Sequence, residues 1–184
     1  MWTARQFHDI YMINLETGER RQIKEKSPSY MRFSPKGKYT YWYQDQDSSW
    51  YTRSMADGKE YRLTTPQTFA AWDEDNDVPD YPSPYGIAGW TDDDQSILIK
   101  DRYDIWKFDP IAASSPVNLT VNGRKEQITY SLIQLDREKR AYNTSEAQYL
   151  TGFNERTKGS GYYTTRLNKP VAPKALLAGN FKLA

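Results

Sequence analysis

YGIAGWTDDDQSILIKDRYDIWKFD, residues 85–109, is the stretch that decides the fold. Its first six residues are mostly small or apolar, and residues 97–99 form an Ile-Leu-Ile run of the kind that favours packed β-strands. Between these runs lie three consecutive aspartates, residues 92–94, whose side chains accept hydrogen bonds from nearby backbone and favour tight turns. A second break at residues 101–102 precedes a further alternating run, 103–108. Three short strands joined by tight turns predict an antiparallel meander.

The end of this stretch recurs along the chain. Residues 104–109, DIWKFD, resemble three other segments, which are 9–14, 49–54 and 161–166. Each of the four is followed by a turn and another strand-like segment. Each complete unit is also preceded by an apolar residue and a charged turn, at 33–38, 90–95 and 135–140. The starts of these turns are 57 and 45 residues apart. Repetition at roughly 40–50 residues, with four strands in each repeat, is typical of propeller blades.

The repeats predict an all-β fold, a partial β-propeller of about three four-stranded antiparallel blades with WD-like repeats. Residues 1–184 are expected to form one propeller region, an arc of a larger wheel, with residues 178–184 beginning a further element. An open arc leaves a sheet face exposed at each end, so we also expect self-association. The expected divisions are blade-like units at 27–64, 83–120 and 128–177, a partial unit at 9–23 and an inserted loop at 65–84.

Composition excludes several classes of function and of site. The formal net charge of +1 gives no electrostatic basis for binding nucleic acid or an anionic membrane surface. No apolar run approaches the roughly 20 residues of a membrane span, and residues 1–8 lack the apolar region of a signal peptide. The absence of cysteine excludes disulfides, thiol nucleophiles and cysteine zinc sites. Fifteen tyrosines and six tryptophans suit half-exposed strand faces, where the ring packs and the polar tip stays hydrated.

Few residues stand out as chemical candidates. His8 is the only histidine; it ends a segment, 1–8, that is expected to form a strand or arm, and we interpret it as a surface or strand-end residue. Aspartates alternate from Asp73 to Asp77 as they do in a calcium loop. However, Val78 and Pro84 stand where that loop requires glycine and a bidentate glutamate. We therefore interpret the inserted loop as a proline-pinned segment that caps a sheet edge or meets another domain.

A second insertion is expected at residues 145–161, which end in Gly159-Ser160-Gly161. A nucleophile elbow needs Gly-x-Ser-x-Gly on a strand-to-helix turn, whereas the flanks here are strand-like and polar, so a flexible hairpin is the expected structure. The sequence has no glycine-rich phosphate cradle, no paired metal histidines and no elbow serine. We therefore assign no catalytic, cofactor-binding or metal-binding residue and expect no cofactor.

The repeats resemble those of the prolyl oligopeptidase and dipeptidyl peptidase family, and those of Tol-type propellers. The resemblance covers nearly the whole chain and is carried by residues 31–37 (MRFSPKG), 62–64 (RLT), 89–94 (GWTDDD), 103–109 (YDIWKFD) and 118–120 (NLT). Residues 73–77, 85–90 and 101–106 together are particularly similar to large secreted peptidases of this family from Bacteroides-like bacteria.

The resemblance implies the non-catalytic, N-terminal propeller of a secreted or periplasmic serine peptidase. In that family a C-terminal α/β-hydrolase domain carries the catalytic Ser, Asp and His, and the propeller limits the access of peptide substrates. None of this triad maps onto the chain, and no adjacent Glu-Glu pair is present to bind a substrate amino terminus. The chain alone is therefore expected not to hydrolyse peptides. Two alternatives stay open: a Tol-like propeller that serves as a protein- or ligand-binding scaffold, and a small β-domain with an independent role.

Overall fold

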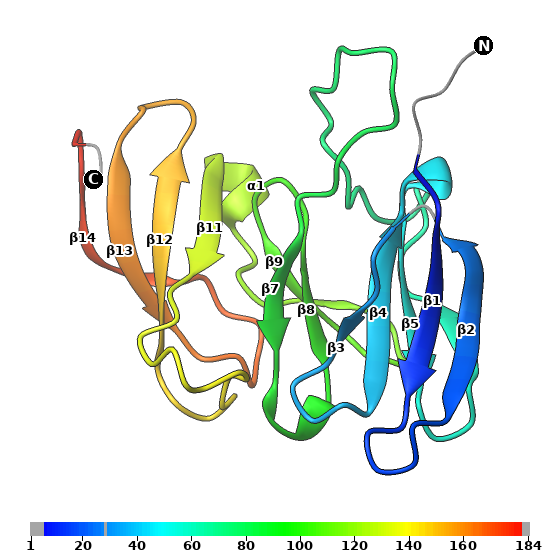
Figure 1. Ribbon diagram of the computed structural model, residues 1–184. Coiled ribbons are helices and arrows are strands. Elements are labelled where there is room, and N and C mark those ends of the chain that lie inside the picture. The colour runs from blue at the N-terminus through cyan, green and yellow to red at the C-terminus, as the bar shows by residue number, and fades with distance from the viewer. Residues whose placement is uncertain (1–5, 28, 182–184) are drawn as a thin grey trace.

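The computed structural model describes residues 6–27 and 29–181, so the segments 1–8 and 178–184 lie partly outside the described residues. Strands dominate this part of the chain (Figure 1). The helical elements found in it are α1 (Gly123–Glu126) and the 3-10 turns η1 (Asp45–Asp47) and η2 (Asp92–Asp94). No helix among the described residues has the length and apolarity that crossing a membrane requires.

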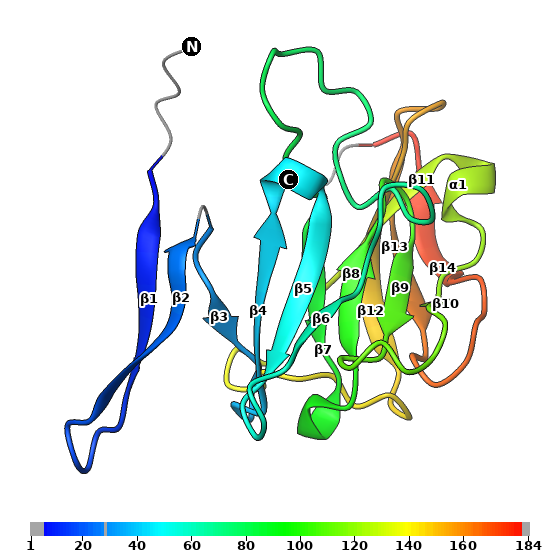
Figure 2. The ribbon, with the colours of Figure 1, turned by 90° about the vertical axis from the view of Figure 1, so that its right-hand side faces the viewer.

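The strands form one hairpin and three four-stranded antiparallel sheets, which lie side by side in sequence order (Figures 1 and 2). In each sheet every strand pairs with the next along the chain, so each sheet is a meander. The prediction of an all-β partial propeller is confirmed, while the unit boundaries stay predictions. The hairpin is β1 (His8–Ile13) and β2 (Arg20–Ser27); the first sheet is β3 (Arg32–Phe33), β4 (Tyr39–Gln44), β5 (Ser49–Ser54) and β6 (Glu60–Arg62); the second is β7 (Ile87–Trp90), β8 (Ile97–Lys100), β9 (Ile105–Phe108) and β10 (Val117–Asn118); the third is β11 (Ile128–Leu132), β12 (Gln148–Asn154), β13 (Ser160–Thr165) and β14 (Lys174–Gly179).

The prediction of an insertion at residues 145–161 is wrong, whereas the hairpin expected there is formed by β12 and β13. Strand β12 occupies 148–154 and pairs with both β11 and β13, so this segment supplies the second strand of the third sheet. Gly152 and polar residues weakened the strand signal in this segment. Gly152 lies where Tyr163 of β13 and Ile128 of β11, in the same sheet, leave no room for a side chain. A Cβ at Gly152 would lie 2.5 Å from a ring carbon of Tyr163, so close packing requires glycine at this position. The long connection instead runs from residue 133 to residue 147, between β11 and β12.

Strand β8 shows why the sheets stack. Ile97, Leu98 and Ile99 are all 0% exposed, because both faces of the second sheet are covered. Ile97 and Ile99 join a core cluster with residues of the first sheet, and Leu98 joins another with residues of the third sheet. Alternation along the strand therefore divides the three side chains between two cores. The first core contains Tyr41, Tyr43, Trp50, Trp90 and Phe108, and the second contains Ile105, Leu119, Tyr130, Leu150, Tyr163 and Leu167.

The recurring Leu-Thr pairs close the first two sheets in the same way. The hydroxyl oxygen of Thr64 accepts a hydrogen bond from the backbone N–H of Trp50 at 2.9 Å, and that of Thr120 accepts from Ile105 N–H at 3.0 Å. In each case the preceding leucine donates its backbone N–H to the carbonyl of the same partner. The threonine side chain thus satisfies a buried donor at the point where the outer strand ends.

The outward face of the third sheet carries several exposed apolar side chains, and no described sheet packs against it. Tyr149 and Phe153 lie on this face of β12, and Tyr162 lies on the same face of β13, paired with Leu177 of β14. These four side chains are between 39% and 56% exposed, although the equivalent faces of the first two sheets are buried against a neighbour. Contiguous apolar surface of this kind marks an interaction site.

We expect this face to make the chain self-associate, and replacing Phe153 by aspartate should reduce that association. A carboxylate placed on the apolar face would have to be desolvated when a second molecule covers it. Sedimentation velocity over a range of protein concentrations measures the effect. The control is Leu135→Asp, because Leu135 is 71% exposed in the 133–147 connection, away from the sheet face. Equal association by wild type and Phe153→Asp would contradict the prediction.

Candidate functional site

The long loop at residues 65–84 is anchored before it projects from the sheets (Figure 1). Phe69 and Ala71 are 7% and 0% exposed and belong to the core between the first and second sheets. Trp72 forms an isolated antiparallel bridge with Pro84, and the Tyr85 backbone N–H donates to the Ala71 carbonyl at 2.9 Å. The loop thus leaves and re-enters the core at one place, and residues 73–83 form its projecting part.

Arg102, in the turn between β8 and β9, fastens this projecting part to the third sheet. Its guanidinium donates to Asp75 of the loop at 2.8 Å. It also donates to both carboxylate oxygens of Glu155, at 3.2 and 3.1 Å, in the turn between β12 and β13. Such forked contacts fix the direction as well as the distance of the partners. One arginine therefore joins the inserted loop to the second and third sheets.

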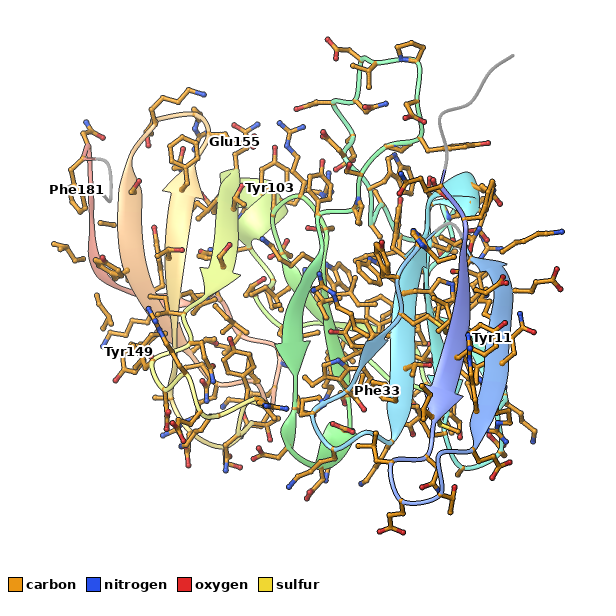
Figure 3. All side chains as sticks on the ribbon, viewed as in Figure 1. Tyr11, Phe33, Tyr103, Tyr149, Glu155 and Phe181 are labelled. Atoms are coloured by element: carbon orange, nitrogen blue, oxygen red, sulfur yellow. The ribbon has the colours of Figure 1, made fainter. Side chains whose placement is uncertain are left out.

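Arg124, in α1, makes a parallel connection. It donates to the two carboxylate oxygens of Glu74 at 3.4 and 3.0 Å and lies 3.7 Å from Asp101. The guanidinium carbons of Arg102 and Arg124 are 5.3 and 5.2 Å from the centre of the Tyr103 ring, which attracts cations. Tyr103 also donates its hydroxyl to Glu155 at 2.8 Å (Figure 3). We call Glu74, Asp75, Asp101, Arg102, Tyr103, Arg124 and Glu155 the loop anchor.

Two buried aspartates hold the backbone beneath the loop anchor. Asp101 accepts the backbone N–H groups of Tyr103 and Asp104 and the indole N–H of Trp106. Asp104, 1% exposed, accepts the Thr120 hydroxyl at 2.6 Å and the backbone N–H groups that begin α1. Burial raises the pKa of Asp101, against the lowering by its backbone donors. These carboxylates have structural partners and so position the arginines.

The charged groups of the loop anchor shift one another's pKa values. Burial acts to raise the pKa of Glu155, but hydrogen bonds from Tyr103 and Arg102 outweigh it and bring that pKa below its ordinary value. Hydrogen bonds to Asp75 and Glu155 raise the pKa of the Arg102 guanidinium, and one to Glu74 raises that of Arg124. The lowered pKa of Glu155 therefore keeps its carboxylate ionised at neutral pH and paired with Arg102.

Among the candidates His8, Ser160 and the alternating aspartates, only Asp75 belongs to the loop anchor. His8 begins β1 and stacks on Tyr30 with 4.3 Å between ring centres. The alternating aspartates do not converge: Asp73 accepts the backbone N–H of Asp75, whose carboxylate binds Arg102. Ser160 is 7% exposed inside β13, where no elbow forms. Within residues 6–27 and 29–181, no cluster of three or more His, Cys, Asp or Glu side chains could hold a metal.

The sequence does not predict the roles of the two arginines and Glu155. Residues 101–102 read only as a break between strands, and Glu155 falls within the predicted insertion. A signal was present, because Arg102 lies in a predicted turn and arginines pair readily with an aspartate-rich loop. Their partners lie 27 to 53 residues away in the chain, however, and their proximity depends on sheet stacking.

A hollow of about 500 Å³ opens at the other end of the sheets, beneath the 133–147 connection. Pro35 and Lys36 of the β3–β4 turn and Asp92 of η2 also line it. Its charged lining includes Lys139 and Arg140 but also Asp136, Glu138 and Glu146, so neither sign dominates. The lining therefore favours no particular class of ligand.

No protein-family model matches the chain, and no curated protein sequence matches it. Among solved structures, the chain is similar to one described as a TolB from Agrobacterium tumefaciens, with a TM-score of 0.49 and 16% sequence identity. The similarity covers 92% of this chain and 56% of that one, so the chain spans little more than half of that protein's length. This similarity is too low to support the fold assignment, which rests on the three stacked sheets themselves.

Replacing Arg102 by alanine should free the projecting loop while leaving the sheets folded. The variant loses the contacts to Asp75 and Glu155, so amides of residues 74–82 should exchange faster with solvent. The free energy of unfolding should fall by only about 1 kcal/mol, because partly exposed ion pairs contribute little. Hydrogen exchange and chemical denaturation measure the two effects. Lys59→Ala, which removes an exposed pair with Asp57, is the control and should leave the loop unchanged.

Acid should release the loop in the same way. The pKa of Glu155 is lower in the folded protein than its ordinary value of 4.5, so its contribution is complete above that value and is lost as the pH falls through the lowered pKa. Loop exchange, corrected for the intrinsic pH dependence of amide exchange, should therefore accelerate below pH 4.5. In Glu155→Gln the loop should already be loose at neutral pH and respond less to acid. An identical acid response in both proteins would contradict this assignment.

Proposed function

We propose that this chain is a non-catalytic β-propeller segment that binds another folded domain through the face carrying residues 65–84. The observation that carries the proposal is a pair of arginines that each join the projecting loop to the sheets. Arg102 pairs with Asp75 of the loop and with Glu155, and Arg124 pairs with Glu74 of the loop and with Asp101. Ordering a long loop costs conformational entropy at the time of binding. A loop that is fastened in advance has already lost that freedom and presents a defined surface.

We propose further that the bound domain is the α/β-hydrolase domain of a secreted or periplasmic serine peptidase, and that the propeller gates peptide access to it. What supports it is the resemblance carried by residues 31–37, 89–94 and 103–109 to propeller repeats of the prolyl oligopeptidase and dipeptidyl peptidase family. Catalysis then belongs to residues outside this chain, and the chain alone acts as no enzyme.

The reading frame downstream of residue 184 tests this further proposal. A Gly-x-Ser-x-Gly segment at a strand-to-helix turn, followed by an Asp and a His, is the expected finding. Cleavage of short prolyl peptides by the longer protein, but not by residues 1–184 alone, would support the assignment. A frame with no hydrolase domain would overturn it and favour the alternative of a Tol-like scaffold for a protein or ligand.

A separate experiment tests the role of the loop face. If the hydrolase domain is expressed as its own polypeptide, its affinity for this chain should fall when Arg102 and Arg124 are both replaced by alanine. Lys59→Ala is the matched control for loss of a surface cation. Unchanged affinity in the double variant would show that the loop face is not part of the interface. It would not contradict the proposal that the partner is a hydrolase domain.

A further inference from the structure

The connection between the second and third sheets contains the pair Asn122-Gly123, directly at the start of α1. Of the asparagines in the chain, this one alone precedes a glycine. An asparagine side chain closes into a five-membered succinimide when the nitrogen of the next residue attacks its Cγ atom. Glycine hinders this attack least, because it has no Cβ. The pair is therefore the position in the sequence most prone to deamidation.

Close packing requires the glycine of this pair. A Cβ on Gly123 would lie 2.6 Å from a carboxylate oxygen of Asp104 and 2.9 Å from the Tyr103 carbonyl oxygen. Gly123 is buried, and its backbone N–H donates to Asp104 at 2.9 Å. A larger residue would slow the attack on Asn122 but would push the chain away from Asp104. The contact that holds α1 in place therefore keeps a reactive pair in the chain.

The folded structure holds the pair in an unreactive geometry. Attack begins when the Gly123 nitrogen loses its proton, but the hydrogen bond to the buried Asp104 keeps that proton from hydroxide. The ψ angle of Asn122 is −1°, so the Gly123 nitrogen eclipses the Asn122 nitrogen and is turned away from the side chain. The Asn122 Oδ1 atom also accepts the Tyr130 hydroxyl at 3.2 Å. The pair must therefore leave this geometry before it can react.

The backbone around the pair favours local opening. Val121 has a φ angle of 65°, which a β-branched residue rarely adopts, and its side chain is 50% exposed. Gln127, after the last residue of α1, is also left-handed, with a φ angle of 54°. Between them α1 has only four residues, too few to be stable without its contacts to the sheets. A strained, short segment of this kind opens more easily than the sheets beside it.

We propose that Asn122 is a modification site at which local opening of α1 leads to deamidation and releases one half of the loop anchor. In the open segment, hydroxide removes the Gly123 amide proton, and the nitrogen attacks the Asn122 Cγ atom. The N–Cγ bond forms, the Cγ–Nδ2 bond breaks, and ammonia leaves with a proton from water. Water then opens the succinimide at either carbonyl and gives aspartate or isoaspartate.

Isoaspartate prevents α1 from returning to its place. The main chain then runs through the Cβ atom, and the new carboxylate lies next to the carboxylate of Asp104, which it repels. The N–H groups of Gly123 and Arg124, which donate to Asp104 at 2.9 and 3.1 Å, can no longer both reach it. Arg124 thereby loses the position from which it binds Glu74, and the loop is held by Arg102 alone.

The test is to age the 184-residue chain at mildly alkaline pH, in buffer and in urea, and to follow deamidation of Asn122 by peptide mapping. The folded chain should react about tenfold more slowly or less, by the factor that folding imposes on hydrogen exchange of the Gly123 amide. The factors should agree because both reactions begin with loss of the same proton. Equal rates in buffer and urea would overturn the proposal. So would a rate that follows the most protected amides of the sheets, because the reaction would then require global unfolding.

A pair of matched variants tests the contact with the side chain. Tyr130→Phe keeps the ring in the core but removes the hydroxyl that binds Asn122, so deamidation of the folded chain should accelerate about fivefold, as for loss of one neutral hydrogen bond. The control is Tyr163→Phe, because the Tyr163 ring packs on that of Tyr130 with 5.2 Å between centres. It should leave the rate unchanged. Equal acceleration by both variants would overturn the proposal, since it would report a loosened core.

The consequence for the loop is measured on aged protein. Deamidation adds one negative charge, so ion-exchange chromatography separates the product from the unmodified chain. In the isoaspartate fraction, amides of residues 74–82 should exchange with solvent faster than in fresh protein, and to the same extent as in Arg124→Ala. Loop exchange that is unchanged in this fraction would overturn the link between Asn122 and the loop anchor.

Discussion

Replacing Asp94 by alanine is expected to lower the free energy of unfolding by about 3 kcal/mol, because it strips a buried carboxylate from several donors. Asp94 lies at the end of η2 in the second sheet and is 2% exposed. It accepts the Ser34 hydroxyl at 2.5 Å, the Lys36 N–H at 3.1 Å and the Lys38 N–H at 3.2 Å. All three donors belong to the β3–β4 turn of the first sheet. Loss of these hydrogen bonds would leave the Ser34 hydroxyl and the N–H groups of Lys36 and Lys38 unpaired at the contact between the first and second sheets.

Asp93→Ala is a closely matched control for this experiment. Asp93 and Asp94 have φ angles of 56° and 55°, so alanine brings the same left-handed backbone strain to both positions. The Asp93 side chain is exposed, and the bond from Lys38 reaches its backbone carbonyl, which alanine keeps. The difference between the two variants in chemical denaturation therefore isolates the carboxylate. Equal losses of stability would show that backbone strain, and not the inter-sheet contact, dominates.

Replacing Leu98 by alanine should cost about 3 kcal/mol of unfolding free energy through the cavity that it leaves. Leu98 is 0% exposed and lies in the core between the second and third sheets, with Ile105, Tyr130 and Leu150. Sheets on both sides fix the surrounding side chains, so the space has little room to collapse. Chemical denaturation measures the loss, and Leu98→Met, which conserves volume, should cost less than about 1.5 kcal/mol. A similar cost for both variants would contradict the cavity explanation.

The strand pattern and the repeats were readable from the sequence because they depend on local chemistry. The three consecutive aspartates form η2, and the Ile-Leu-Ile run forms β8, with two residues directed to one core and one to the other. The Leu-Thr pairs recur because each closes its sheet with the same threonine hydrogen bond. Turn residues and β-branched runs act over a few positions, so a linear reading finds them.

Other features of the fold depend on distant partners. Residues 145–161 resembled an insertion because Gly152 replaces the side chain that a strand pattern requires, and the need for glycine arises only against Tyr163. The exposure of Phe33 is likewise invisible in the sequence, since the matching Trp90 is buried by strands of another sheet. In both cases the neighbouring strands, and not the local residues, set the environment.

The sequence by itself therefore determined the all-β repeat, and it contains no recognisable catalytic motif. Only the tertiary structure decided how the loop at residues 65–84 is held, because Arg102 meets Asp75 and Glu155 across 27 and 53 residues of chain. An ion pair depends on the positions of both side chains, and here stacking of the second and third sheets sets those positions. Strand propensity acts between near neighbours, whereas the loop anchor exists only once the blades have packed.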